Sequence, residues 1–435
     1  MSPIHLLVLI HGMWGNPGHL AELQRIAGET YSEPTEDGTK LEILVPETNR
    51  ENSTYDGVDW GGERVAKEIL EKVEALEKDG GEVKKLSVTG YSLGGLVARY
   101  VVGILSQQGF FDKVTPVNFN TIATPHIGLP RYPSFISSVF STLGPKLLSR
   151  TGEQFYCVDK WSPKGRPLLV VMADPERIFY QALTKFQHLR IYANAINDVT
   201  VPYVTAAIEL EDPFAEYQTN GLELTMVEGH RHVIKEWSLP DIPPPRPVKP
   251  RVLSREWASS IKFRKPFLPP ALQFRFPFNL VVYTMLPVLI PTFISLVLVN
   301  FTLNSHKSKA RIKLLENEYK TTNEQKLIHI LAELEREVED AIVDMVDSDD
   351  PGTMTPTSSS KSVAIIRPQA HPILSAHQKK IANWLNTLPG LKKEMVFLPD
   401  IRNSHATIVS RDVKRFESHR DGEDVIRHWA KHLII

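Results

Sequence analysis

The sequence predicts an α/β protein whose mostly parallel sheet is flanked by helices on both faces. Short apolar segments alternate along the chain with longer segments that carry apolar residues at helical spacing. A Gly-x-Ser-x-Gly pattern joins one apolar segment to one such helix, and a His-Gly turn follows another. Because functional residues in such sheets gather where the strands end, we expect both turns at one edge of the sheet.

The first predicted strand covers residues 6–10 and ends in a His-Gly-Met-Trp-Gly turn. Its continuously apolar sequence is typical of a strand that is covered on both faces. In α/β-hydrolases, a backbone N–H just after such a glycine binds the negative oxygen that forms during the reaction. We therefore expect Gly12 to shape this turn and the Met13 N–H to be one oxyanion donor.

The predicted strand over residues 86–89 leads into the Gly-x-Ser-x-Gly pattern, with Ser92 at its centre. A nucleophile elbow has this sequence, because the serine needs a strained backbone and side chains at Gly90 and Gly94 would collide with strand and helix. We predict that Ser92 is a nucleophile and that the Leu93 N–H is the second oxyanion donor.

An acidic residue is expected just past a late strand, where it would orient a histidine. Asp198 follows the predicted strand over residues 189–196, in an Asn-Asp-Val-Thr-Val-Pro turn. Asp174 is the alternative, and ordinary Asn/Asp turn chemistry could explain either residue. Other elements expected from the pattern are strands over 41–45 and 117–122, a helix over 64–76, and a lid or packed helix over 134–148.

Composition excludes several classes of function. The chain has 435 residues and a net charge of −1, which argues against a general nucleic-acid binder. Its one cysteine, Cys157, excludes an internal disulfide and a Cys-rich metal site, and suits a reducing compartment. The N-terminus has no features of a secretory signal. We expect no metal, no cofactor, and catalytic residues that face the cytosol.

A segment without charged residues spans 276–305 and is long enough to cross a bilayer. Pro287 and Pro291 lie at its centre, and basic residues flank both ends. These features favour a proline-bent hairpin inserted in one leaflet, with both ends on the cytosolic side. A single transmembrane span, or a buried core helix, is the alternative.

The segment divides the chain. We expect a core over residues 1–240, a basic Pro-rich linker over 241–275, the hydrophobic hairpin over 276–305, an amphipathic helix over 306–346, and a low-complexity, disordered linker over 347–370. Residues 371–435 then resume the α/β pattern, with helices over 378–385 and 423–433 and a strand over 394–398.

His405 follows this last predicted strand, where the hydrolase order Ser…Asp…His ends. It is therefore our candidate for the general base. His230 and His232 are the competitors, and either would complete the set before the apolar segment.

Five motifs together resemble the fungal serine esterase/lipase family of the α/β-hydrolase fold, which includes a yeast lipid-droplet phospholipase and the Rog-type lipases. The motifs are Leu-Ile-His-Gly-Met-Trp-Gly-Asn at 9–16, Gly-Tyr-Ser-Leu-Gly-Gly at 90–95, Thr-Pro-His-Ile-Gly at 124–128, Asn-Asp-Val-Thr-Val-Pro at 197–202 and Ser-His-Ala at 404–406. The resemblance covers about residues 4–235 and 390–435. It implies triad roles for Ser92, Asp198 and His405.

The resemblance also implies hydrolysis of glycerolipid esters at a lipid-droplet or endoplasmic-reticulum surface, with the catalytic part facing the cytosol. A protein-depalmitoylating thioesterase would use the same residues. A membrane tether with a disused hydrolase body is a reading from a different class. We expect a lipid substrate and a lipid surface as partners, and no nucleic acid.

Overall fold

The computed structural model describes residues 2–242, 244, 278–321 and 371–435. Its strands form one eight-stranded sheet in the order β2-β1-β3-β4-β5-β8-β7-β6. The strands are β1 (Ser2–Ile10), β2 (Lys40–Leu44), β3 (Gly81–Tyr91), β4 (Thr115–Ile122), β5 (His188–Asn194), β6 (Glu223–Met226), β7 (Val233–Ser238) and β8 (Leu391–Val396). The pairs from β2 to β8 are parallel, so the predicted α/β-hydrolase architecture is confirmed.

The last two strands at one edge were not expected from the sequence; β7 runs antiparallel to β8, and β6 runs antiparallel to β7. β6 and β7 form a hairpin whose side chains are largely exposed, and β7 pairs with β8 over only a short stretch. Their sequences mix charged and apolar residues, a pattern typical of an exposed edge and weak as a strand signal.

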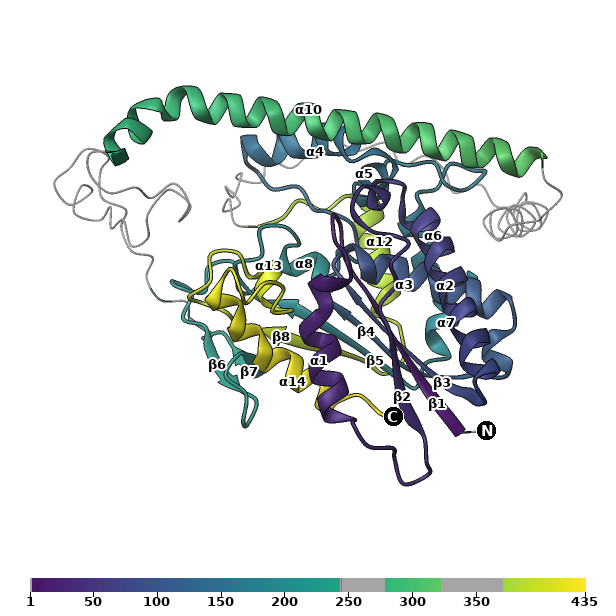
Figure 1. Ribbon diagram of the computed structural model, residues 1–435. Coiled ribbons are helices and arrows are strands. Elements are labelled where there is room, and N and C mark those ends of the chain that lie inside the picture. The colour runs from purple at the N-terminus through teal and green to yellow at the C-terminus, as the bar shows by residue number, and fades with distance from the viewer. Residues whose placement is uncertain (1, 243, 245–277, 322–370) are drawn as a thin grey trace, which may run out of the picture.

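Helices cover both faces of the sheet, as Figure 1 shows. The helices before the apolar segment are α1 (Ala21–Thr30), α2 (Val58–Lys78), α3 (Leu93–Gln107), α4 (Phe135–Leu147), α5 (Ser149–Phe155), α6 (Leu168–Ala173), α7 (Ile178–Thr184) and α8 (Tyr203–Ala206). After it come α12 (Ala376–Leu385), α13 (Ser404–Thr407) and α14 (Gly422–Lys431). Short 3₁₀ turns include η1 (Pro17–Leu20), η2 (Glu51–Tyr55), η3 (Phe110–Asp112) and η5 (Glu417–Asp421).

Strand β1 shows how the sequence builds two cores. Leu6, Val8 and Ile10 point into a core formed with α2, α3, α6, α7 and α12. Leu7 and Leu9 point to the opposite face, into a second core formed with α1 and α14. Alternate side chains of a strand lie on opposite faces of the sheet. A strand covered on both sides is therefore apolar throughout, as the sequence predicted.

The C-terminal segment of the chain completes this architecture. β8 inserts between β5 and β7, and α14 packs beside α1. The Tyr31 hydroxyl at the end of α1 donates hydrogen bonds to the carbonyls of Ala430, at 2.9 Å, and Leu433, at 2.7 Å. The loop between β8 and α13 is thus brought to the edge of the sheet where β3 and β5 end.

The apolar segment forms one continuous helix, α10 (Phe278–Thr321), in place of the expected hairpin. Pro287 and Pro291 lie inside it. Each proline removes one backbone donor, but the other i→i−4 bonds persist and no turn forms. The hairpin prediction was therefore wrong in its geometry. The alternative of a buried core helix is also wrong, because the most apolar part of this helix is exposed rather than buried within the protein.

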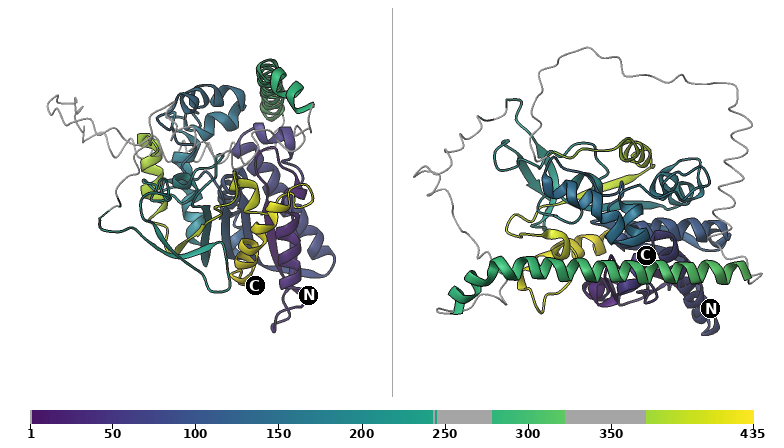
Figure 2. Two further views of the ribbon diagram at one scale, coloured as in Figure 1. Left: turned by 90° about the vertical axis from the view of Figure 1, so that its left-hand side faces the viewer. Right: turned by 90° about the horizontal axis from the view of Figure 1, so that it is seen from above.

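Helix α10 crosses the top of the molecule beside α4, and Figure 2 shows this from above. It holds the one stretch in the described part of the chain that is long and apolar enough to cross a membrane. The predicted linkers and the end of the predicted amphipathic helix lie outside the described residues; residues 306–321 of that helix continue α10.

Candidate active site

Ser92 lies at the turn from β3 into α3, in a strained backbone conformation. Its φ of 56° and ψ of −127° are unfavourable for a residue with a side chain. A Cβ atom on Gly94 would lie 2.1 Å from the Ile10 carbonyl oxygen, and one on Gly90 would lie 2.4 Å from the Gly95 Cα. Both glycines are therefore required by the close approach of strand, turn and helix, for the reason that the sequence suggested.

His405 joins Ser92 to Asp198 by two hydrogen bonds. The distance from His405 Nε2 to Ser92 Oγ is 3.0 Å, and that from His405 Nδ1 to Asp198 Oδ2 is 2.9 Å. With the Nδ1–H donating to the carboxylate, Nε2 is free to accept the serine proton. All three residues are buried. The structure therefore brings together three residues from three distant parts of the sequence.

The Asp198 carboxylate accepts four hydrogen bonds. Besides the one from His405, they come from the Thr200 N–H at 3.0 Å, the Val201 N–H at 2.7 Å and the Asn194 Nδ2 at 2.9 Å. This many donors fixes the orientation of the carboxylate toward His405. Asn194 was not among the expected site residues, although it is the last residue of β5 and precedes the Asn-Asp turn.

The loop that carries His405 is tied to the neighbouring strands. The Tyr91 hydroxyl donates to the His405 carbonyl at 2.9 Å, and the two rings lie 5.1 Å apart. Burial raises the pKa of Tyr91, so its hydroxyl stays a donor. Ser404 donates through its N–H to the Asn197 carbonyl at 2.9 Å, and through Oγ to the Ile196 carbonyl at 2.9 Å. These contacts position the imidazole before any substrate binds.

The turn after β1 lies against the serine. A Cβ on Gly12 would be 2.7 Å from the Ser92 Cβ, so the turn can approach only because Gly12 lacks a side chain. The Gly15 N–H donates to the Gly12 carbonyl at 3.1 Å and closes a β-turn around Met13 and Trp14. The two expected oxyanion donors are the amides of Met13 and Leu93. Met13 follows the end of β1, and Leu93 directly follows Ser92 after the end of β3.

A cavity of about 630 Å³ opens beside Ser92. Helices α4 and α5, together with the loops after β1, β4 and β5, form most of its wall, which is mainly apolar, and Phe301 of α10 also lines it. The expected lid segment is therefore part of this wall. Phe135 of α4 is 83% exposed, and Phe140, which also lines the cavity, is 61% exposed. The apolar side chains of α4 thus both line the cavity and face outward.

The alternative candidates for the acid and the base make contacts with other parts of the structure. Asp174 accepts hydrogen bonds from Arg166 at 2.9 Å and from the Glu176 N–H at 3.1 Å. His230 contacts Asp424 at 2.9 Å, and the His232 Nδ1 donates to the Phe397 carbonyl at 3.2 Å. These contacts assign all three to the structural framework.

Cys157 is a free cysteine that is buried in the structure. Burial raises the pKa of the Cys157 thiol to about 12, so it carries no reactive thiolate. Among the described residues, no group of three or more His, Cys, Asp or Glu side chains could hold a metal ion.

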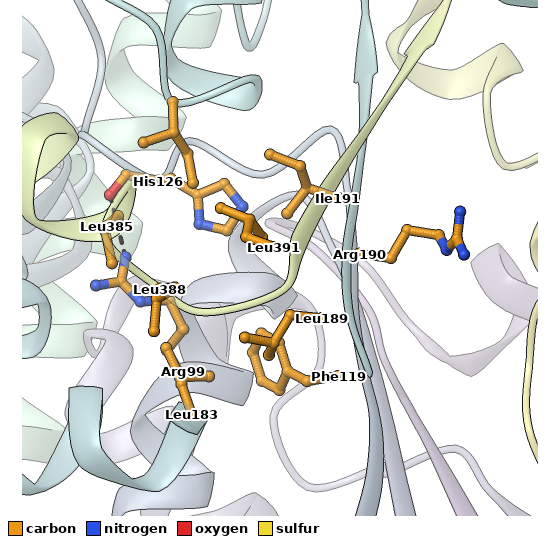
Figure 3. A pocket seen from close by; sticks show the side chains of 11 residues that line it. Arg99, Phe119, His126, Leu183, Leu189, Arg190, Ile191, Leu385, Leu388 and Leu391 are labelled. Carbon is orange, nitrogen blue, oxygen red and sulfur yellow. Dashed lines mark hydrogen bonds between the residues drawn. The ribbon is translucent and has the colours of Figure 1, made fainter. Parts of the chain in front are cut away.

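The Thr-Pro-His motif has a structural role. His126 Nε2 lies 2.8 Å from the Thr121 Oγ1, and its carbonyl accepts a hydrogen bond from the buried Arg99 at 3.1 Å. Burial lowers the pKa of His126, so the ring is neutral. Figure 3 shows both residues at a small cavity of about 20 Å³, while Arg190 points away from it. Arg99 and His126 therefore fix the loop after β4 and are not part of the Ser92 site.

Comparisons with known proteins relate the N-terminal part of the chain to serine esterases and lipases. Residues 1–209 match the profile of the family described as "Putative serine esterase (DUF676)". The "Putative lipase C4A8.10" of Schizosaccharomyces pombe is 33% identical over 211 residues, which are 47% of this chain and 26% of that protein. The "Putative lipase ROG1" of Saccharomyces cerevisiae is 30% identical over 209 residues, 47% of this chain and 28% of that protein.

The matched region spans less than a third of the length of these two relatives. It includes Ser92 and Asp198 but ends before His405. The resemblance that the motifs suggested is confirmed, and it supports a hydrolase of the lipase type. Residues 1–209, just under half of the chain, are therefore similar to this serine esterase family.

Proposed function

We propose that the protein hydrolyses carboxylic esters of membrane or lipid-droplet glycerolipids through an acyl-enzyme on Ser92. The observation that carries this proposal is the chain of hydrogen bonds from Ser92 through His405 to Asp198. The same three residue types in the same relation recur in serine hydrolases on unrelated folds. The family match supports the hydrolase class independently.

The proposed reaction has two steps. His405 Nε2 takes the Ser92 proton while Oγ attacks the ester carbonyl carbon, and the Met13 and Leu93 N–H groups bind the resulting oxyanion. His405 then gives that proton to the departing alcohol, which leaves an acyl-serine. Water attacks the acyl-serine with His405 again as base, the carboxylic acid leaves, and Ser92 recovers its proton. Asp198 keeps the imidazole in the required tautomer and stabilises its cationic form.

A lipid substrate is supported by the wall of the cavity. It is lined by apolar and aromatic side chains, among them Leu129, Leu148 and Phe155, next to the nucleophile. Such a wall suits an acyl chain and offers few partners to a polar substrate. The relatives are themselves described as lipases.

A lipid surface as the site of action is supported by α10. Residues 281–303 of this helix expose apolar side chains, including Val288, Phe293 and Leu296. Lys307, Lys309 and Lys313 follow them and are exposed. Apolar residues next to cations suit a helix that lies in the interface of an anionic membrane. α10 runs along the face of the body that carries α4, and this orientation favours a helix lying on the surface.

The test compares the purified protein with Ser92→Ala on three substrates: phospholipid vesicles, a triacylglycerol emulsion and an S-acylated cysteine peptide. We expect Ser92-dependent release of fatty acid from one of the two glycerolipids. Faster cleavage of the thioester would identify a depalmitoylating enzyme instead. If none of the three substrates is hydrolysed in a Ser92-dependent way, the protein is instead a membrane tether with a disused hydrolase body.

A further inference from the structure

Trp14, directly after the proposed oxyanion donor Met13, has an unfavourable backbone conformation. Its φ is 54°, and it occupies the third position of the β-turn closed by the bond from Gly15 to Gly12. This position normally takes glycine or asparagine when φ is positive. A tryptophan is kept there only if the surrounding structure holds it. The contacts of Trp14 therefore determine the shape of the turn that presents the Met13 N–H.

Two of these contacts come from η2. The Trp14 N–H donates to the Thr54 Oγ1 at 3.1 Å, and its indole N–H donates to the Tyr55 hydroxyl at 3.0 Å. The third contact comes from the apolar insert. The ring of Phe301 in α10 stacks on the indole, with 5.7 Å between the centroids and 3° between the planes. Phe301 also lines the cavity that contains Ser92.

A group of polar contacts from Asn304, Ser308 and Arg311 holds this part of α10 against η2, and we call this group the seat of α10. The Arg311 Nη2 donates to the buried Asp56 carboxylate at 2.7 Å and to the Asn52 carbonyl at 2.8 Å. Ser308 Oγ donates to the same carboxylate at 2.7 Å. Asn304 lies beside the hydroxyl of Tyr55, which accepts the indole N–H of Trp14. Residues 301, 304, 308 and 311 repeat at helical spacing, so they form one face of α10.

We propose that Phe301 is a positioning residue, through which the seated insert holds Trp14, and with it the Met13 N–H, in the conformation that binds the oxyanion. The inference rests on the proposed function and deepens it. It makes the apolar helix part of the catalytic arrangement as well as a lipid anchor. An insert that served only for attachment would not need a ring stacked beside the oxyanion turn.

The test measures kcat and KM for a short, water-soluble acetyl ester, whose acyl group needs little of the cavity and no membrane. Phe301→Ala should lower kcat by at least about tenfold, since a lost oxyanion donor costs about 100-fold or more. KM should change by less than about twofold, because the ground-state ester gains little from that donor. Phe301→Tyr keeps the stacked ring and should restore kcat. Leu314→Ala, which truncates an exposed apolar side chain on the same helix, should leave kcat unchanged.

A double-mutant cycle tests whether the effect passes through Trp14. Glycine adopts positive φ without support. In a Trp14→Gly background, Phe301→Ala should therefore change kcat by less than about twofold. An undiminished loss in that background, or wild-type kcat in Phe301→Ala alone, would overturn the inference. Phe301→Leu, which keeps apolar contact without stacking, replaces the alanine variant if that fails to fold. Full activity of Ser92→Ala would instead refute the proposed function.

Discussion

His405 Nε2 lies 3.0 Å from Ser92 Oγ, although 313 positions separate the two residues in the sequence. The distance is within the range for a general base and its nucleophile. It exists because β8 enters the middle of the sheet after the whole apolar insert and delivers the following loop to the end of β3. The insert therefore divides the sequence of the hydrolase without dividing its fold.

The carboxylate of Asp198 is expected to be required for rate rather than for folding. Asp198→Asn should lower kcat by about 10³- to 10⁴-fold, because the amide would favour the wrong tautomer of His405. Steady-state kinetics on the acetyl ester measures the loss. Asp174→Asn is the control, since Asp174 contacts arginines remote from Ser92. A larger loss of kcat in the control than in Asp198→Asn would indicate that Asp174, and not Asp198, is the acid that orients His405.

The membrane-facing residues are expected to affect binding to lipid without affecting hydrolysis of a soluble ester. Phe135 and Phe293 are exposed on α4 and α10. Each should contribute about 1.5–3 kcal/mol on burial in the interface, so each alanine substitution should weaken vesicle binding by about tenfold or more. Co-sedimentation with anionic vesicles measures this. Leu210→Ala, a change of an exposed residue in the loop after α8, is the control. Equal vesicle binding by all three variants would show that this face of α4 and α10 does not bind lipid.

Stability should decline below neutral pH because histidines that are buried as neutral rings, among them His5, His126 and His428, take up protons on unfolding. Burial lowers the pKa of His5 and of His428 to about 3, with smaller contributions from Lys85 and from neighbouring histidines. Between pH 6.5 and 3 the unfolded chain therefore binds more protons, and the free energy of unfolding falls as pH falls. From pH 7.5 to pH 5, each histidine should cost about 2 kcal/mol.

Urea unfolding at pH 7.5 and pH 5 measures this decline. His5→Gln removes one of the titrating groups and should reduce the difference in unfolding free energy between the two pH values by about 2 kcal/mol. His377, which is exposed, provides the control substitution to glutamine. The same pH dependence in wild type and His5→Gln would show that other groups dominate.

A buried ion pair ties α5 to α2 below the cavity wall. Arg150 donates through Nη2 to the buried carboxylate of Asp59 at 2.5 Å, and Gln154 donates to the same group at 3.0 Å. Arg150→Met leaves that charge without its main partner and should lower the free energy of unfolding by about 3–5 kcal/mol. The exposed pair of Lys78 and Glu74 offers a contrast, and Lys78→Met should cost less than about 1 kcal/mol. Similar losses in both would contradict this assignment.

Much of the site could be predicted because its chemistry constrains the sequence. Ser92 needs glycines two residues away on either side, and the close contacts of Gly90 and Gly94 explain this requirement. His405 could be found because it follows a strand that the hydrolase needs to complete its sheet. Asn194 was missed, since a strand residue that donates to a neighbouring acid has no spacing of its own.

The insert was harder to predict because proline gives an ambiguous signal. Pro287 and Pro291 remove two helix donors, and the sequence alone cannot decide between a turn and a helix that tolerates the loss. The seat of α10 depends on Asp56, Ser308 and Arg311, which meet only in the folded chain. The stacking of Phe301 on Trp14 likewise follows from tertiary structure and from no motif.

The most direct measurement is the reaction of the intact protein with a fluorophosphonate probe, followed by mass-spectrometric mapping of the adduct. We expect a single adduct on Ser92 in the wild type and its loss in His405→Ala, with His377→Ala, which removes an exposed imidazole from the same C-terminal segment, still labelled. An adduct on another residue, or undiminished labelling of Ser92 without the imidazole, would contradict the central claim that the C-terminal segment completes the site.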